Sequence, residues 1–160
     1  MKSYTMTVEL GSLEVRLIRE FESPAALVYR AYVDPEAIPR WWGPGNLVTV
    51  VDRLEAWPGG SWRFCQTEPD GEQYAFRGFY HQVDPGRRLV YTFEWEGLPG
   101  HILLETIDFL DLPDGRCRLV DSSVFQSVED RDGMVAMGME TGAAESLERL
   151  QTWLREPPEV

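Results

Sequence analysis

Turn signals at regular intervals constrain this chain more than any other feature. The segments between them are short and rich in valine, tyrosine, phenylalanine, tryptophan and threonine, which favour strands. The turn signals are clusters of proline, glycine and aspartate, which form the tight loops between neighbouring antiparallel strands. The pattern therefore predicts a meander of six strands between Asn46 and Gln126. The five turn clusters are Pro58-Gly59-Gly60, Pro69-Asp70-Gly71, Asp84-Pro85-Gly86, Gly97-Leu98-Pro99-Gly100 and Pro113-Asp114-Gly115.

The segment before the meander predicts one strand and two short helices. Residues 12–21 alternate between apolar and polar side chains, which is typical of a strand. Ser23-Pro24 then has the pattern of an N-cap followed by a first-turn proline, which predicts a helix through Tyr32. Asp34-Pro35 repeats the pattern and predicts a second short helix, which Pro39 disturbs.

The last segment has helical periodicity from Arg131 to Arg155, and we expect one long helix there. A strand, two short helices, a meander and a C-terminal helix together predict an α+β fold whose sheet buries one face against that helix. We expect one domain over residues 1–160, ordered from about 5 to 155. The apolar face of the expected helix holds Val135, Met139, Ala143, Ser146, Leu147, Leu150 and Leu154.

Charge and hydropathy exclude several classes of partner. The 160 residues hold 15 basic and 27 acidic side chains, a net charge of −12. Nucleic acids and anionic membranes are polyanions that need a basic surface, so we expect neither as a partner. No apolar run approaches the length of a membrane span or signal sequence, which predicts a cytoplasmic protein without membrane insertion.

Reactive residues are scarce. Cys65 and Cys117 are the two cysteines, and two cysteines far apart in sequence do not make a disulfide framework, so we expect two free, buried or half-buried thiols. His81 and His101 are the two histidines, and we expect both to face solvent. A zinc site would need nearly all four side chains, and a Schiff base would need Lys2 at the terminus. We therefore predict neither a metal nor a cofactor, and we assign no catalytic residue among these side chains.

Several local motifs, in order along nearly the whole chain, resemble the START-like superfamily, also called helix-grip, Bet v 1-like or polyketide cyclase-like. The closest branch is that of the homologues of the heat-shock-protein-90 ATPase activator. The resemblance implies a curved antiparallel sheet of about seven strands (β-α-α-β6-α) around the C-terminal helix, with an internal cavity. The motifs are residues 18–24 with Val28-Tyr29-Arg30-Ala31, Trp41-Trp42-Gly43-Pro44, Pro58-Gly59-Gly60 with Trp62-Arg63-Phe64, Val83-Asp84-Pro85 with Arg88-Leu89-Val90-Tyr91, residues 127–134, Gly138-Met139-Glu140, and Glu145-Ser146 with Arg149-Leu150.

The chain departs from this family in two places. Many members carry a histidine near the end of the last strand and a tryptophan in the final helix. The corresponding segments here are Asp121-Ser122-Ser123 and Gly142-Ala143-Ala144. Activities that depend on those two side chains are therefore not carried over to this chain.

Aromatic side chains gather on one face of the expected sheet. Strand alternation places Trp62 and Phe64, then Phe76 and Tyr80, and then Tyr91 with its neighbours on a common side. The helix expected opposite carries small residues. Large rings that face small residues either interdigitate in an ordinary core or leave a ligand pocket, and both alternatives stay open.

Trp41-Trp42 follows the second short helix. Two adjacent indoles cannot both point inward from a regular element, so we expect one to anchor the helix in the core. The other is expected at a surface or at the mouth of a cavity.

Glu105 shares a strand face with Leu103 and Ile107 and is expected to point inward. A buried carboxylate needs a partner or a raised pKa, and Arg118 on the next strand is the candidate partner. Alternatively, the two residues form a cross-strand pair on the solvent face. A ligand anchor and a general acid or base are the functional interpretations of Glu105.

The sequence thus favours a binding protein for a small hydrophobic or aromatic molecule, as a monomer or homodimer. One alternative is a co-factor of the chaperone heat-shock protein 90, and another is a cyclase or hydrolase that uses Glu105. Met134 and Met137 are expected either to pack on the first helices or to form an apolar rim. The expected ligand-binding residues are Trp41, Trp42, Trp62, Phe64, Phe76, Tyr80, Tyr91, Phe93, Leu103, Glu105, Arg118, Met134, Gly138 and Gly142.

Overall fold

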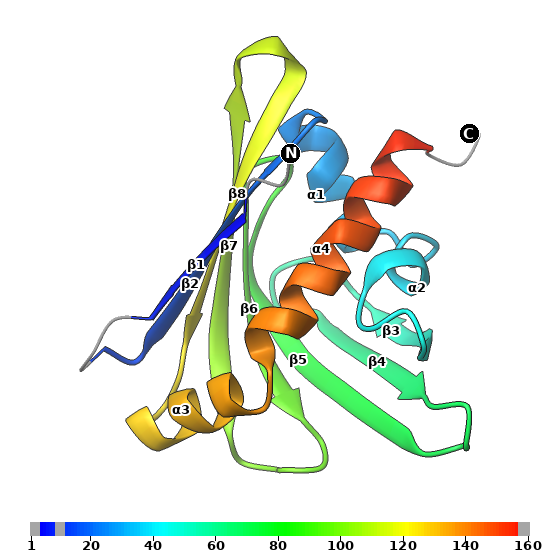
Figure 1. Cartoon of the computed structure of the whole chain (residues 1–160), viewed down its shortest axis with the longest axis vertical. Helices are drawn as coiled ribbons and strands as arrows, with labels where there is room; N and C mark the ends of the chain where they lie inside the picture. The colour runs from blue at the N-terminus through cyan, green and yellow to red at the C-terminus, as the bar shows by residue number, and fades with distance from the viewer. Residues whose placement is uncertain (1–3, 9–11, 157–160) are drawn as a thin grey trace.

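The computed structural model describes residues 4–8 and 12–156 and has an α+β fold. Eight antiparallel strands form one sheet in the order β1-β2-β8-β7-β6-β5-β4-β3. The sheet curves, and helix α4 runs obliquely across one of its faces (Figure 1). The elements are β1 (Tyr4–Val8), β2 (Glu14–Phe21), α1 (Ala25–Val33), α2 (Ile38–Trp41), β3 (Val48–Leu54), β4 (Ser61–Thr67), β5 (Gln73–Asp84), β6 (Arg88–Trp95), β7 (Ile102–Leu112), a 3-10 turn (Pro113–Gly115), β8 (Arg116–Val124), α3 (Val128–Ala136) and α4 (Met139–Arg155).

The predicted helix-grip class is confirmed. The six-stranded meander is β3 to β8, and each of the five predicted turns joins two of its strands. β2 lies beside β8 and continues the sheet from the last strand of the meander. β1 adds one strand beyond the expected seven, paired with β2 at the sheet edge. The expectations for Lys2 and for residues 157–160 lie outside the described residues.

The start of α1 differs from the predicted capping pattern. Pro24 occupies the N-cap position and offers no side-chain cap. The backbone N–H of Ala25 instead donates to Asp111 Oδ1 of β7 at 3.0 Å. Ser23 is buried rather than capping the helix. A carboxylate 86 residues away thus replaces the local cap, which no local sequence signal can show.

The long C-terminal helix is interrupted, so its predicted continuity is wrong. Ser127 caps α3 by accepting from the Asp130 N–H at 3.0 Å. Gly138, with φ of +90°, then separates α3 from α4. A left-handed glycine commonly ends a helix because it lacks a Cβ that would clash there. The helical spacing of apolar residues continues across Gly138, so the periodicity of the sequence showed no sign of the break.

The two faces of the sheet have opposite character. The inner face and α4 form the main core, in which Leu150 and Leu154 of α4 are 0 % and 4 % exposed. The outer face carries cross-strand ion pairs, among them Arg77 with Glu94, Nε to Oε1 at 3.0 Å. Such exposed pairs contribute little stability each, so the fold depends on the inner face.

Gly78 in β5 lets a tryptophan cross the sheet. Its register partner is Trp62 in β4, whose indole N–H passes over β5 and donates to the Thr92 carbonyl of β6 at 3.1 Å. A Cβ at Gly78 would lie 1.7 Å from that carbonyl oxygen and 2.6 Å from Trp62 Nε1. The glycine is therefore required for the position of the Trp62 ring.

We expect Gly78→Ala to destabilise the protein by about 2–3 kcal/mol, because the methyl group must displace either a strand or Trp62. Gly133→Ala is the matched control, since a Cβ there meets nothing within 4 Å in helix α3. The control should gain about 0.5–1 kcal/mol. Urea unfolding followed by tryptophan fluorescence measures both, and equal stability of the two variants would contradict this account.

Candidate functional site

A cavity of about 300 Å³ lies between the inner face of the sheet and α4. Aromatic rings from β4, β5 and β6 form its sheet side, and Gly142, Ala143 and Ser146 line it from α4. The rings pack edge to face or tilted; Trp62 and Tyr91, for example, have centroids 5.9 Å apart. The wall is thus mainly apolar, as in small-molecule sites.

Most of the predicted ligand-binding residues meet at this cavity, although their role in binding remains a prediction. Arg118 and Gly138 do not line it: Arg118 faces outward, and Gly138 is the exposed break between α3 and α4. The residues that do line it are Trp41, Trp42, Trp62, Phe64, Phe76, Tyr80, Tyr91, Phe93, Leu103, Glu105, Met134 and Gly142.

The two adjacent tryptophans have the divergent orientations that were expected. Trp41 is 3 % exposed, and its indole N–H donates to the Ala31 carbonyl at 3.0 Å. Trp42 turns toward the cavity, where its ring meets Phe64 and Phe76 edge to face at 5.1 and 5.3 Å. Trp41 therefore anchors α2 in the core, Trp42 packs on the aromatic rings of the sheet, and both line the cavity.

The loop after Trp42 is fixed to α4 by hydrogen bonds. The Gly43 N–H donates to Ser146 Oγ at 3.0 Å, and Arg149 Nη1 donates to the Gly43 carbonyl at 2.7 Å. Gly43 has φ of +82°, and a Cβ there would lie 1.8 Å from Gln66 Nε2. This loop holds α2 and α4 together beside the cavity, and sequence reasoning did not assign Gly43 or Ser146 to the site.

Two buried carboxyl groups form the polar part of the cavity wall. Glu105 on β7 is 9 % exposed and lies opposite Ser123, whose hydroxyl donates to Glu105 Oε1 at 3.0 Å. A side-chain hydrogen bond links Glu105 to Asp121 of β8. Among the described residues, no other donor reaches Glu105 Oε2 or Asp121 Oδ1.

The pKa of both carboxyls is raised. Burial raises the pKa of Glu105 well above its ordinary 4.5, and the charge of Asp121 raises that pKa further. Burial also raises the pKa of Asp121, although the hydrogen bond from Glu105 opposes that shift. Both shifts favour the protonated form, because two adjacent carboxylates in an apolar wall repel each other and are poorly solvated.

Two tyrosines lie near the Glu105 and Asp121 carboxyls. Burial, then the charges of Asp121 and Glu105, raise the pKa of Tyr32 on α1 well above its usual value. Burial and the same two charges raise the pKa of Tyr91 on β6. Both hydroxyls therefore stay protonated, and both side chains line the cavity.

Arg118 is not the partner of Glu105, which corrects the prediction. It lies on the outer face, where its Nη2 meets Glu20 Oε2 at 3.0 Å and its side chain is 45 % exposed. The strand register places Ser123, not Arg118, opposite Glu105. Asp121 shares the inner parity of Ser123 on β8, and that alternation was the signal that could have identified it.

The remaining reactive side chains lie away from the cavity. His81 and His101 are exposed, as expected, and His101 Nδ1 is 2.8 Å from Asp130 Oδ1. Cys65 and Cys117 are free, also as expected, with Cys117 buried.

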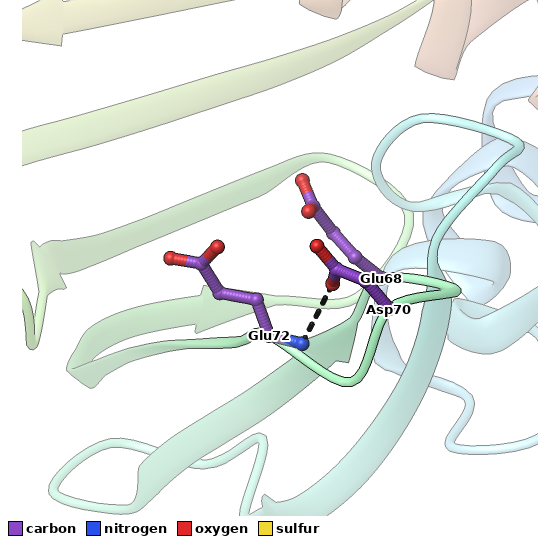
Figure 2. A group of neighbouring side chains, drawn as sticks. All are labelled: Glu68, Asp70 and Glu72. Atoms are coloured by element: carbon purple, nitrogen blue, oxygen red, sulfur yellow. Dashed lines mark hydrogen bonds between the residues drawn. The ribbon is translucent and has the colours of Figure 1, made fainter.

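A group of carboxylates outside the cavity lies at the turn between β4 and β5. Figure 2 shows Glu68, Asp70 and Glu72, one oxygen of each within 4.8 Å of the others. The Glu72 N–H donates to Asp70 Oδ1 at 2.9 Å, and the Tyr74 hydroxyl donates to Glu68 Oε1 at 3.1 Å. These bonds shape the hairpin turn, and we assign the group to turn structure rather than to a metal site.

Comparison with known proteins agrees with this geometry. Residues 22–155 match the family described as "Activator of Hsp90 ATPase homolog 1-like protein". The chain belongs to this family. No curated protein matches the sequence. Among the described residues, no helix has both the length and the apolar character needed to cross a membrane.

Solved structures of proteins from three bacteria share its fold. A protein from Arthrobacter aurescens is 25 % identical with a TM-score of 0.87, covering 97 % of this chain and 93 % of its own. A Mycobacterium smegmatis protein is 21 % identical with a TM-score of 0.86, covering 99 % and 100 %. A Chromobacterium violaceum protein is 28 % identical with a TM-score of 0.76, covering 87 % and 95 %.

We expect Glu105→Gln to gain stability over the wild type as pH rises from 5 to 8. The raised pKa of Glu105 means that the folded chain binds more protons than the unfolded chain above about pH 4.5. The free energy of unfolding of the wild type therefore falls with rising pH, and glutamine removes this contribution. Urea unfolding across this pH range measures the difference.

Asp108→Asn is the matched control, because Asp108 pairs with Arg88 on the outer face, Oδ1 to Nε at 2.6 Å. Its stability difference from the wild type should stay constant over the same pH range. A constant difference for Glu105→Gln as well would contradict a protonated carboxyl pair.

Proposed function

We propose that this protein binds a small, mainly apolar molecule in the cavity between the sheet and α4. The observation that carries the proposal is the volume of about 300 Å³ between a wall of aromatic rings and the small residues of α4. This is within the size range of small-molecule sites. The free thiols Cys65 and Cys117 support a reducing, cytoplasmic location for this function.

The open space around Gly142 supports a ligand pocket rather than a core that side chains fill. A Cβ at Gly142 would meet no atom within 4 Å, although the residue lies on the cavity side of α4. Protein interiors otherwise pack closely, and a void forgoes dispersion contacts along its lining. A bound apolar molecule would restore those contacts.

A second hollow of about 430 Å³ supports a route for the ligand. It lies between α3 and the ends of β5, β6 and β7, and it shares Phe76, Phe93, Leu103 and Met134 with the first cavity. Met137 is 72 % exposed and forms part of its lining. A flexible methionine at such a rim adapts to ligands of different shapes.

Native mass spectrometry of freshly isolated protein tests the proposal directly. We expect a fraction of the molecules to carry a bound small molecule that is lost on denaturation. Because Trp42 and Trp62 line the cavity, binding of added ligand should also change the tryptophan emission. A protein without any co-purified molecule, and without a response to a library of apolar small molecules, would contradict the proposal.

We expect Gly142→Leu to abolish ligand binding while the protein stays folded, because the side chain enters the open volume of the cavity. Gly142→Ala is the matched control: it should keep binding within about threefold and gain about 0.5–1 kcal/mol from helix propensity. Titrations monitored by tryptophan fluorescence, together with thermal unfolding, measure both effects. Ligand affinity unchanged in Gly142→Leu would contradict binding at this site.

The family description supports a second candidate, a co-factor that stimulates the ATPase of heat-shock protein 90. Such a function uses a protein surface, so Gly142→Leu should leave it intact. Purified chaperone and this protein would be mixed and ATP turnover measured. Turnover unchanged by a molar excess of this protein would reject the candidate, whatever the outcome of the ligand experiments.

A further inference from the structure

We infer that the cavity selects apolar molecules that carry a protonated amine, and that the amine binds at Glu105 and Asp121. The inference rests on the proposed function, because it names the chemical class of ligand for the same cavity. It separates amines from carboxylates and from neutral alcohols of the same shape.

The first step is the unmet bonding capacity of the carboxyl pair. Glu105 is more than nine-tenths buried and lines the cavity together with Asp121. Ser123 supplies one hydrogen bond to Glu105 Oε1, while Glu105 Oε2 and Asp121 Oδ1 meet no donor from any other described side chain. A carboxyl oxygen has two lone pairs, so the pair keeps acceptor capacity for a ligand N–H even though a hydrogen bond links the two groups.

The second step is charge. Glu105 and Asp121 are the acidic side chains of the cavity lining, so any ionisation of the pair places negative charge inside an apolar wall. Among the described residues that line the cavity, there is no lysine, arginine or histidine. Arg19, a buried arginine of β2, is bonded to Glu148 of α4 instead, Nη2 to Oε2 at 3.2 Å. A cationic ligand would compensate the buried charge, whereas a carboxylate ligand would add to it.

The third step is the aromatic surround. The side chains of Tyr32 and Tyr91 lie close enough to the pair for its charge to act on them, and both line the cavity. The Trp62 ring packs edge to face with the Tyr91 ring, with centroids 5.9 Å apart. Aromatic faces attract ammonium groups, and more strongly where water is excluded. Rings and carboxyls thus favour the same class of ligand.

Three probes of matched shape test the inference: 2-phenylethylamine, 2-phenylethanol and phenylacetate. At pH 7 these are a cation, a neutral molecule and an anion. Isothermal titration calorimetry on the full chain should give an affinity for the amine at least tenfold above that for the alcohol. The affinity for phenylacetate should be lower still.

Charge-neutral variants then locate the preference. Glu105→Gln and Asp121→Asn should each reduce the affinity for the amine at least tenfold and leave that for the alcohol within about threefold. Asp108→Asn removes the same charge on the outer face, where Asp108 pairs with Arg88, and should change neither affinity. Thermal unfolding of each variant verifies that it is folded.

The outcomes separate the two proposals. Equal affinity for amine and alcohol overturns the amine preference but upholds binding in the cavity. An amine preference that survives both Glu105→Gln and Asp121→Asn overturns the assignment to the carboxyl pair. Binding of none of the three probes overturns the amine preference, and native mass spectrometry of the isolated protein then decides the cavity function independently.

Discussion

The packing of α4 against the curved sheet is the interaction on which the rest of the structure depends. The two halves of the helix do different things. Leu150 and Leu154, in its C-terminal half, are almost fully buried in the main core. Gly142 and Ala143, near its start, face the aromatic rings without filling the space between. The same helix therefore secures the fold at one end and leaves a cavity at the other.

Two glycines determine the positions of the aromatic rings and of the loop beside the cavity. Gly78 lets Trp62 reach across β5 to a carbonyl of β6. Gly43 lets its loop pass close to Gln66, and the loop bonds to Ser146 of α4. Close packing in these places holds the rings and the helix at a fixed separation, so the open volume is a property of the fold rather than of one loose contact.

The carboxyl pair is the exception in an otherwise apolar wall. Burying two carboxyls reduces stability at neutral pH, and an apolar pair of the same volume would avoid that penalty. In the proposal made above, Glu105 and Asp121 beside Tyr32 offset this penalty by binding the amine of the ligand. The family relationship establishes the fold, while the site alone carries the argument for a ligand class.

The sequence by itself determined the order of elements, the six-stranded meander and the aromatic face, because turn residues and strand alternation are local signals. It also predicted that Trp41 and Trp42 diverge, and it left open whether Glu105 faces inward or lies on the solvent face. Tertiary structure decided that Asp111 caps α1, that Gly138 divides the last helix and that the inner-face residue Asp121, rather than Arg118, is bonded to Glu105. Those outcomes depend on strand register and on groups far apart in the chain. A shift of one residue in register reverses which side chains share a face.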